Sequence, residues 1–544
     1  MIIPNVKKEE KGNKVFYVST DITINVCEEY ADKACIALEA FLPQCTVEKK
    51  TDAALITVVH DEKLADAAEA YRMEIAETGI VVYCAEYLGL RNALATFSVL
   101  VSCKDGQLKL YETCIEDAPK AKHRGAMLDV AGTVKPFEGL CDDLVLMAKA
   151  RMNRAQIYLF DRAGVSLELE SLPKNCWVEG AYTKQQMREL CRFADALGIT
   201  VIPEFDMPGH SDKLFEVFEE FRCDAPRTEG MRVNSVCTGE PRLYELYENL
   251  INEILEVFPG PYFHMGGDEI EMLDLNVECL WDNCSKCRKL REENGLKDRQ
   301  EQYYYFVKRI NDIVRKAGRT MIMWSDQLDC PRGALLPDNI IMHFWRVAFP
   351  SRGPYEGCSM NAQAALGYKI INSYYPETYT FTGEPIIMNS ETLRKWRWDR
   401  QPDCEEQYRE QILGSELCVW GYTSKKLCEY MERFLPSAIV MMGDKLWNNE
   451  ELEYTEEYCR QLTKVVLGAS VPEGLNVFEA IGDVLPPAEN DIPSYVERVT
   501  CSNEKLEEIM AALNKPNTYL KGDAARAENY LVCARYTLEK KSEK

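Results

Sequence analysis

The sequence predicts an α/β protein in which a (β/α)8 TIM barrel follows a small α+β domain and precedes a helical extension. From Arg124 onward a short, largely apolar run recurs eight times, and each run is followed by a longer amphipathic stretch. No Gly-x-Gly-x-x-Gly motif follows the first run. Alternating strands and helices form parallel sheets, and eight such units favour a closed barrel over an open, doubly wound sheet.

Residues 1–118 are predicted to form the small α+β domain, because apolar runs alternate with amphipathic stretches over this part of the chain. The expected elements are strands at 54–59 and 79–82 and helices at 64–71 and 88–101. An acidic, proline-bearing stretch at 115–122 is the predicted linker to the next domain.

Residues 119–448 are predicted to form the barrel. Its eight expected strands lie at 125–130, 155–160, 199–205, 262–265, 320–324, 340–345, 368–373 and 416–420. The pattern then changes to acidic, helix-like sequence, so residues 449–544 are predicted to form a helical C-terminal extension. This extension would either cover the barrel or form the contact of a homodimer, and the sequence leaves both open.

The composition is that of an ordinary globular protein, with 46% hydrophobic and 28% charged residues. A formal net charge of −24 disfavours nucleic acid as a partner, because surfaces that bind nucleic acid are normally basic. The first ten residues are charged rather than signal-like, and no apolar run is long enough to span a bilayer. We therefore expect no membrane contact and a cytoplasmic location, the alternative being a secreted protein without its signal.

The 22 cysteines are spread through the chain among apolar neighbours. Because disulfide-rich scaffolds are typically small secreted domains, reduced and mostly buried thiols are expected here. One cluster, Cys279, Cys284 and Cys287, contains a C-x-x-C pair and could hold zinc if a fourth ligand came from elsewhere. No cofactor and no catalytic metal are predicted.

Carboxylates and aromatic residues dominate the ends of the predicted strands. Active sites of such barrels are built from residues at the carboxyl ends of the strands, so these residues are the candidates. Glycoside hydrolysis needs this combination, because one carboxyl group protonates the leaving oxygen, a second group stabilises the cationic centre, and flat aromatic side chains stack on the sugar. The candidates are Asp129, Asp161, Glu204, Asp206, His210, His264, Asp268, Glu269, Trp324, Trp345, Tyr374, Tyr375, Glu377 and Trp420.

The adjacent acids Asp268 and Glu269 are the strongest catalytic candidates. Adjacent acids are common by chance among 88 acidic residues, but this pair follows an apolar strand and two glycines, Gly266 and Gly267. Glycines remove side-chain bulk where a ligand or another backbone must come close. Two neighbouring carboxyl groups in a partly buried pocket also tend to separate in pKa, so one can stay protonated near neutral pH.

The chain resembles glycoside hydrolase family 20, the β-N-acetylhexosaminidases, from Arg124 to about Trp447. The motifs that carry the resemblance are Arg-Gly-Ala-Met-Leu-Asp at 124–129, Gly-Ala-Tyr-Thr at 180–183, Ile-Pro-Glu-Phe-Asp-Met-Pro-Gly-His at 202–210 and His-Met-Gly-Gly-Asp-Glu at 264–269. Residues 1–118 resemble the small α+β domain that often precedes this barrel in the family.

This resemblance implies an exo-acting, retaining glycosidase that removes terminal β-linked N-acetylglucosamine, N-acetylgalactosamine or both from an amino-sugar glycan. The nucleophile would be the carbonyl oxygen of the substrate's own 2-acetamido group, which closes to an oxazolinium intermediate. Glu269 would act as general acid and then as base, while Asp268 would accept the acetamido N–H and stabilise the developing charge.

The same resemblance assigns four residues to the sugar pocket. Trp324, Trp345 and Trp420 match the family's aromatic box around the acetamido methyl group and the sugar ring. Tyr375 matches the tyrosine that donates to the acetamido oxygen. Each tryptophan alone is more often a core residue than a ligand platform, so the prediction depends on their joint placement at the strand ends.

The remaining assignments concern the outer hydroxyls and a relay. Arg124 would bind the hydroxyls at C3 and C4, and Glu377 stands where the family usually has an Asp that reaches C4 and C6. Asp161 and His210 resemble the relay that tunes Glu269, and His264 is grouped with them as a supporting residue. Taken alone, Arg124 could equally be an ion-pair partner and His210 a loop histidine.

The chain departs from the family pattern at three places on the rim of the pocket. Arg162-Ala163-Gly164-Val165 stands where the family usually continues with Asp, Gln-Gly and Trp-Arg. Tyr422 replaces the glutamate of the last-strand Trp-x-Glu, and Gly132 stands near a position where arginine is common. The choice between gluco and galacto sugars and the acceptor side are therefore left open.

Two other functions compete with this prediction. A metal-dependent barrel hydrolase would use Glu204, Asp206, His210, His264 and Asp268 as ligands, but the chain has only five His and no His-Glu-x-x-His motif. A non-catalytic or narrowly specialised amino-sugar-binding relative would keep the pocket without turnover. The presence of the acid, its neighbour and all three tryptophans favours the enzyme.

Overall fold

The computed structural model describes residues 5–448, apart from 133, 227–233, 271–279, 347–357, 380–395 and 422–424, together with five positions between 458 and 466. Most of the predicted C-terminal extension therefore lies outside the described residues. Within the described part of the chain, no helix combines the length and the apolar character needed to cross a bilayer.

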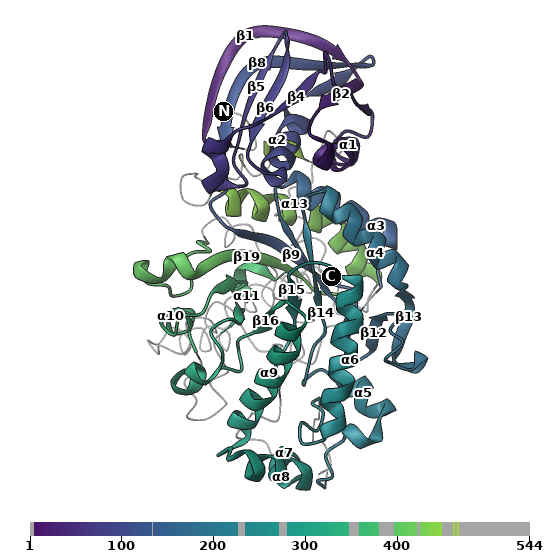
Figure 1. The fold of residues 1–544 in the computed structure, drawn as a ribbon, viewed down its shortest axis with the longest axis vertical. Coiled ribbons are helices and arrows are strands. Elements are labelled where there is room, and N and C mark those ends of the chain that lie inside the picture. Colours follow the sequence, from purple (N-terminus) through teal and green to yellow (C-terminus); the bar gives the residue numbers. More distant parts are fainter. Residues whose placement is uncertain are drawn as a thin grey trace, which may run out of the picture.

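Eight parallel strands close into a barrel, as the sequence predicts (Figure 1). In barrel order they are β9 (His123–Asp129), β10 (Arg154–Tyr158), β14 (Thr200–Glu204), β15 (Tyr262–His264), β16 (Thr320–Trp324), β17 (Ile341–Phe344), β18 (Ile370–Asn372) and β19 (Ile412–Val419). Each of the eight predicted runs contains or overlaps one strand. The last strand begins earlier than predicted, because Gly414 interrupts the apolar run without ending the strand, and it packs directly on the backbone of His123.

Helices follow the barrel strands along the chain, and most of them lie along the outside of the barrel (Figure 1). They are α3 (Phe137–Lys149), α4 (Lys184–Ala196), α5 (Asp212–Val217), α6 (Pro241–Val257), α7 (Leu280–Asn283), α8 (Ser285–Asn294), α9 (Arg299–Lys316), α10 (Met360–Ala365), α11 (Tyr375–Thr378) and α13 (Lys425–Asn448). The connection after β10 also holds a small sheet of β11 (Phe160–Asp161), β12 (Gly164–Leu167) and β13 (Trp177–Tyr182). Local signals set the helix starts: Thr183 and Gln186 form a capping box at the start of α4.

The barrel interior changes from apolar to polar toward the carboxyl ends of the strands. Alternate residues of a strand point to the same side, so positions two apart both face inward. Ile202, Ile322, Ile341 and Ile371 form an apolar cluster of their own. Two residues further along the same strands or just past their ends stand Glu204, Trp324, His343 and Ser373, all of which are buried. The site therefore rests on a polar, hydrogen-bonded layer rather than directly on the apolar core.

The N-terminal domain is a mixed sheet covered by two helices. Its strands are β1 (Lys8–Ser19), β2 (Asp21–Asn25), β3 (Thr46–Lys49), β4 (Ile56–His60), β5 (Tyr71–Ala76), β6 (Gly79–Cys84), β7 (Ser102–Lys104) and β8 (Gln107–Asp117), and its helices are α1 (Glu28–Phe41) and α2 (Tyr87–Leu100). The predicted strands at 54–59 and 79–82 and the helix at 88–101 are present. The predicted helix at 64–71 is wrong in part, because only the short 3-10 helix η1 (Glu62–Ala67) forms there and Tyr71 begins β5.

Two side chains of α2 fasten this domain to the barrel helices. Arg91 is fully buried and donates to the carbonyls of Ala148 and Met152 at 2.9 and 2.8 Å, at the carboxyl end of α3. Tyr87 donates to the carbonyl of Ala196 at the end of α4. The last carbonyls of a helix lack partners within the helix, so Tyr87 satisfies the carbonyl of Ala196, whereas the carbonyl of Ala148 also accepts from the N–H of Arg151. Figure 1 shows α1 and α2 on the side of the sheet that faces the barrel, with α13 passing beneath them.

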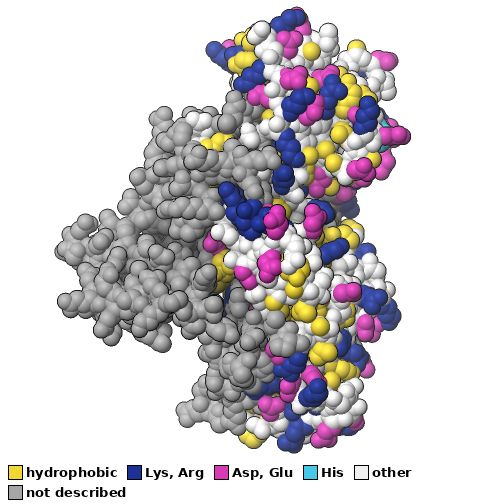
Figure 2. All heavy atoms as spheres, turned by 90° about the vertical axis from the view of Figure 1, so that its left-hand side faces the viewer, with side chains coloured by type: hydrophobic (Ala, Val, Ile, Leu, Met, Phe, Trp, Pro, Cys, Tyr) yellow, Lys and Arg dark blue, Asp and Glu magenta, His cyan; other side chains and the backbone are white. Residues whose placement is uncertain are grey.

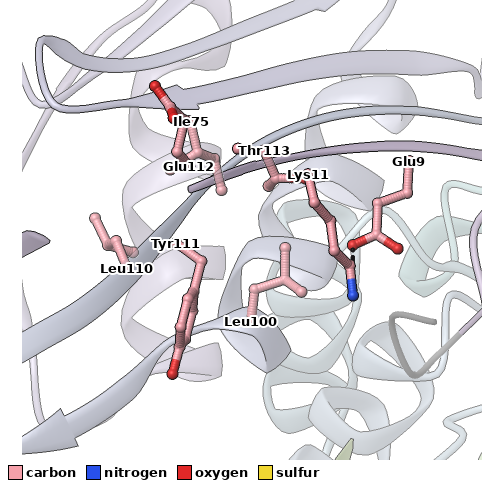
Figure 3. Close-up of a pocket in the computed structure, with 9 residues that line it drawn as sticks. Glu9, Lys11, Ile75, Leu100, Leu110, Tyr111, Glu112 and Thr113 are labelled. Carbon is pink, nitrogen blue, oxygen red and sulfur yellow. Dashed lines mark ion pairs between the residues drawn. The ribbon is translucent and has the colours of Figure 1, made fainter. Parts of the chain in front are cut away.

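A pocket of about 260 Å³ lies in the N-terminal domain (Figure 3). It is lined by residues of β1, β5, β8 and the end of α2, and Lys11 and Glu9 form an ion pair of 3.4 Å at its edge. None of its lining residues belongs to a barrel strand, so it is separate from the strand ends considered below. Figure 2 shows acidic and basic side chains interspersed over the described part of one face.

Candidate active site

The two candidate acids lie in the loop after β15, which turns sharply because of its glycines. Gly266 and Gly267 have φ values of 67° and 98°, in the left-handed region that favours glycine. A side chain at Gly266 would also collide with Asp206, whose Oδ1 accepts the N–H of Gly267 at 2.9 Å. The loop therefore carries Asp268 and Glu269 beyond the carboxyl end of the strand.

Glu269 is fixed at its backbone and contacted from two sides at its carboxyl group. Its φ is 46°, its carbonyl accepts from the amide of Asn234 at 2.8 Å, and its N–H donates to Oδ2 of Asp326 at 3.3 Å. Oε1 accepts from Nη2 of Arg346 at 3.2 Å, and Oε2 lies 3.8 Å from Nε2 of His210. The side chain is 39% exposed, so its carboxyl group remains accessible to a ligand.

Asp268 is buried beside Asp206 and His210. Burial and the like charge of Asp206 raise the pKa of Asp268 well above its ordinary value, while the charge of His210 acts in the opposite direction. Oδ1 of Asp268 has no hydrogen-bond partner among the described residues. Because a buried oxygen without a partner is costly, this atom is a ready acceptor for a donor on a ligand.

His210 connects the carboxyl groups of the site. Its Nδ1 lies 2.9 Å from Oδ1 of Asp161, and its Nε2 lies 4.0 Å from a carboxyl oxygen of Asp206 and of Asp268. Burial alone would lower the pKa of His210, but these three carboxyl groups together hold it well above its ordinary value. For Asp161, burial is outweighed by the contact with His210, which lowers its pKa. The structure thus brings the predicted relay residues together next to Glu269.

His210 is expected to remain protonated at pH values where a free imidazole, with a pKa of about 6.5, has lost its proton. Asp161→Asn should lower this pKa, because the closest carboxyl group loses its charge while Asp206 and Asp268 keep theirs. The measurement is the pH dependence of the ring resonances in histidine-labelled protein, assigned with His210→Gln. A parent resonance that titrates at or below the free value would contradict the geometry.

Aromatic side chains from four strand ends line the region beside the acids. The rings of Trp345 and Tyr379 stack with centroids 5.8 Å apart, and Trp345 meets Tyr375 edge-on at 6.2 Å. Trp420 lies 5.7 Å from Tyr379 and 6.4 Å from Trp324. The three predicted tryptophans and Tyr375 therefore belong to one connected set. The indole nitrogens of Trp345 and Trp420 have no hydrogen-bond partner among the described residues.

Contacts between the acids and the aromatic residues form a closed circuit. Each successive pair is joined by a ring contact, a hydrogen bond or a charge contact. The circuit runs through Tyr158, Trp420, Tyr379, Trp345, Arg346, Glu269, His210 and Asp206 and returns to Tyr158. Residues that are distant in the sequence thus surround one site at the carboxyl end of the barrel.

Glu204 and His264 lie beneath this site rather than in it. Glu204 is fully buried and accepts from the indole N–H of Trp324 at 2.7 Å, which fixes the orientation of that ring. Nδ1 of His264 lies 3.0 Å from Glu204, and its Nε2 lies 3.2 Å from His343. The grouping of His264 with the relay is therefore wrong, because its ring turns into the barrel interior and supports Glu204 instead of reaching His210.

Glu377 lies in α11, directly after Tyr375 and Pro376, at the end of β18. Burial raises its pKa to about 8. Its Oε2 has no hydrogen-bond partner among the described residues. Near neutral pH this carboxyl group is therefore protonated and able to donate to, or accept from, a ligand hydroxyl.

The predicted sugar-binding role of Arg124 is wrong. Arg124 is fully buried near the start of β9, whereas the carboxyl end of that strand is the end that faces the site. Its guanidinium pairs with Glu69 of the N-terminal domain and donates to the carbonyls of Arg151 and Ala121 at 2.8 Å each. The motif at 124–129 does form a strand, as predicted. However, Arg124 lies at the amino end of that strand and Asp129 at its carboxyl end, so the two residues lie at opposite ends of the barrel.

Arg124→Met should therefore reduce stability by about 3–5 kcal/mol, the usual cost of removing one partner of a buried ion pair. KM should not change, because the residue does not reach the site. The midpoint of urea unfolding and the kinetics of the folded variant are the measurements. Lys316→Met, which removes an exposed pair with Glu248, is the control and should cost less than about 1 kcal/mol. A raised KM at parental stability would restore the original prediction.

Sequence reasoning missed three residues that the structure places around Glu269: Asn234, Asp326 and Arg346. Arg346 follows the predicted strand end at Trp345, so the strand-end rule could have found it, but the search favoured carboxylates and aromatic residues. Asp326 stands two residues past Trp324 and was open to the same rule. Asn234 lies in a long loop far from any strand end, and no local pattern indicates it.

Two of the three rim departures fall on described residues. Gly132 is exposed, and its N–H donates to Oδ1 of Asp129 at 3.0 Å. The side chain of Arg162 lies beside α5, with Nε 4.0 Å from Oδ2 of Asp212. Tyr422 lies outside the described residues. Because glycine has no side chain, position 132 offers no side-chain contact to a ligand at the end of β9.

Comparisons with known proteins agree with this geometry. The family described as "Glycosyl hydrolase family 20, catalytic domain" matches residues 122–450. A beta-hexosaminidase of Akkermansia muciniphila is 30% identical over 448 residues, covering 75% of this chain and 87% of the relative. A beta-hexosaminidase of Porphyromonas gingivalis is 31% identical over 375 residues, and the match spans 64% of this chain but only 46% of that protein.

Solved structures share the fold at lower sequence identity. An exo beta-N-acetylglucosaminidase from Vibrio harveyi, solved with N-acetylglucosamine, aligns with a TM-score of 0.73 at 20% identity and covers 86% of this chain and 76% of its own. A beta-N-acetylhexosaminidase from Bacteroides fragilis aligns with a TM-score of 0.71 at 22% identity and covers 86% and 95%. These likenesses concern the fold, which the closed barrel already indicates.

Proposed function

Because the chain belongs to glycosyl hydrolase family 20, we propose that it is an exo-acting, retaining β-N-acetylhexosaminidase that releases terminal N-acetylglucosamine, N-acetylgalactosamine or both. The observation that carries this proposal is the closed circuit of acids and aromatic rings, which holds buried polar atoms without hydrogen-bond partners among the described residues. Asp268 Oδ1 and two indole nitrogens are among those atoms. A sugar with an acetamido group offers the apolar faces, the N–H and the hydroxyls that such a site can bind.

Glu269 is the group that transfers the proton. It is the exposed member of the acidic pair, so it can reach the glycosidic oxygen of a substrate. Protonation of that oxygen breaks the bond to the leaving sugar, and the resulting carboxylate then removes a proton from the water that opens the intermediate. Arg346 and the protonated His210 stabilise the carboxylate when it has given up its proton.

Asp268 is the group that orients the substrate's acetamido arm. Its unpartnered Oδ1 accepts the acetamido N–H, which makes the acetamido carbonyl oxygen a better nucleophile toward C1 of the same sugar. The bond from that oxygen to C1 forms as the bond to the leaving group breaks, and the positive charge moves onto the acetamido group. The positive charge that develops beside Asp268 favours its ionised form over the protonated form that the unliganded site prefers, and the attraction between the two charges is largest in a buried site.

Trp324, Trp345 and Trp420 form the walls for the sugar ring and the acetamido methyl group, and Tyr375 donates to the acetamido oxygen. Glu377, two residues after Tyr375 in α11, is the carboxyl group that contacts an outer hydroxyl of the sugar. Because Gly132 offers no side chain there, hydroxyl recognition on the side of β9 is reduced. We therefore expect tolerance of both epimers at C4.

The proposal is tested with 4-nitrophenyl N-acetyl-β-glucosaminide, its galacto epimer and the plain 4-nitrophenyl β-glucoside. Hydrolysis of the acetamido sugars with retained β configuration in the first-formed product, and no turnover of the glucoside, is the expected result. Equal rates on the glucoside would show that the acetamido group takes no part. Binding of N-acetylglucosamine without turnover of any substrate would identify a sugar-binding protein.

A metal-dependent hydrolase is less consistent with the site. Ligand atoms of Asp206, His210 and Asp268 lie within 4.8 Å of one another. However, only one of these three groups is an imidazole, whereas catalytic zinc sites typically use two or three histidine or cysteine ligands. Activity is therefore expected to persist when a chelator such as EDTA is present in the assay of the folded protein.

A further inference from the structure

Four buried cysteines from two separate loops meet at one point outside the candidate active site. Cys223 and Cys237 lie between β14 and α6, whereas Cys284 and Cys287 lie at the start of α8. The four sulfur atoms all lie within 4.8 Å of one another. The sequence indicated Cys284 and Cys287 as candidates but paired them with Cys279, which lies outside the described residues. Cys223 and Cys237 could not be found by spacing, because at least 46 residues separate them from the C-x-x-C pair.

The sulfur distances fit a shared metal ion better than a disulfide. Sγ of Cys237 lies 3.6 Å from Sγ of Cys284 and 3.6 Å from Sγ of Cys287. A disulfide requires about 2.05 Å. In a tetrahedral zinc site with Zn–S bonds of about 2.3 Å, the sulfur atoms are about 3.8 Å apart. The observed separations are close to this second value for both pairs.

The surroundings of the four sulfur atoms also fit a thiolate site. The N–H of Cys287 donates to the sulfur of Cys284, and the pair occupies the first turn of a ten-residue helix, where the helix dipole favours negative charge. Lys286 lies between the two cysteines in the sequence, and its Nζ is held by Glu240 at 2.7 Å. The N–H of Cys287 and the helix start favour negative charge on the sulfur of Cys284, while Glu240 balances the charge of Lys286.

The two loops are also fitted to each other at the backbone level. The side chain of Asp224, next to Cys223, accepts the N–H of Ser285, next to Cys284, at 2.7 Å. Gly239 packs so closely on Lys286 and Cys287 that any side chain there would collide with their backbone. The loops therefore present four sulfur ligands in a fixed arrangement.

We propose that Cys223, Cys237, Cys284 and Cys287 bind one Zn²⁺ in a structural, tetrahedral site. All four ligand positions are filled by protein, so no position remains for a substrate. The metal would join the loop after β14 to the loop after β15. The first of these loops carries Asn234, which holds the carbonyl of Glu269, so the metal would anchor the segment behind the proposed acid.

The test is metal analysis of the full chain, purified without chelators and dialysed against metal-free buffer. We expect about one zinc ion per chain by inductively coupled plasma mass spectrometry. Chain refolded or grown with Co²⁺ should show the intense visible bands of a tetrahedral cobalt site and a near-ultraviolet thiolate-to-metal band. Cys287→Ser and Cys223→Ser should lose the zinc, whereas Cys176→Ser, a buried cysteine outside the cluster, should keep it.

Outcomes that overturn the proposal are equally specific. Absence of metal from the natively purified chain, with all four thiols alkylated at the rate of free buried cysteines and no cobalt bands, would eliminate the site. Iron at one atom per chain would overturn the choice of zinc. If the serine variants do not fold, the cobalt spectrum of the parent still decides, because only sulfur ligands give the thiolate band.

Discussion

Glu269→Gln should reduce kcat/KM on an unactivated N-acetyl-β-disaccharide by about 10³-fold, within the range that general acid catalysis contributes. Glutamine keeps the shape and the contact with Arg346 but has no proton to give. The loss should be much smaller on an aryl glycoside with a good leaving group, because departure of a stable phenolate needs little protonation. KM should stay near the parental value, since the acid acts on the leaving oxygen rather than on the bound sugar.

The comparison of the two leaving groups separates loss of the acid from general damage. Glu216→Gln, which changes an exposed glutamate of α5 beside Lys213, is the matched control and should leave both rates unchanged. Damage to the fold would lower the two rates by the same factor. Equal losses on the disaccharide and on the aryl glycoside would therefore remove Glu269 from the role of acid.

The fold was predictable because its signals are local and repeated. Each barrel strand is a short apolar run, and eight of them in sequence leave few architectures other than a closed barrel. The rule for strand ends then brought Asp268, Glu269, His210 and the tryptophans together correctly. The assignment of Arg124 was wrong, because it came from motif resemblance and not from this rule, and the residue lies near the start of its strand instead of at its end.

What the sequence could not provide are contacts between loops. Asn234 reaches Glu269 across a separation of 35 residues, and Arg346 does so across 77. Cys223 meets Cys287 through two loops that share no pattern. Such contacts depend on where the barrel places successive loops, and a hydrophobic period describes only the elements between them.

Asp268→Asn should lower kcat by about 10²–10³-fold, the range found when one group that stabilises developing charge is removed. The same change should leave the protein as stable as the parent at neutral pH, or more stable. The pKa of Asp268 is raised in the folded state, so the folded protein prefers its protonated form, and stability is lost as pH rises above the pKa of the unfolded chain. Asparagine does not ionise, so Asp268→Asn removes the cost of burying a charged carboxylate at this position.

Asp161→Asn is the matched comparison for Asp268→Asn. The pKa shifts of the two carboxyl groups have opposite signs, so their ionisation changes the stability of the fold in opposite directions. The pKa of Asp161 is lowered in the folded state, so its carboxylate contributes stability above the unfolded pKa, and that contribution is lost as pH falls through the folded pKa. At neutral pH Asp161→Asn should therefore lower the thermal midpoint while Asp268→Asn does not. Thermal unfolding of both variants between pH 5 and pH 8, beside kcat at each pH, is the measurement. A lower midpoint together with parental kcat for Asp268→Asn would show that the buried carboxyl group serves the fold and not the reaction.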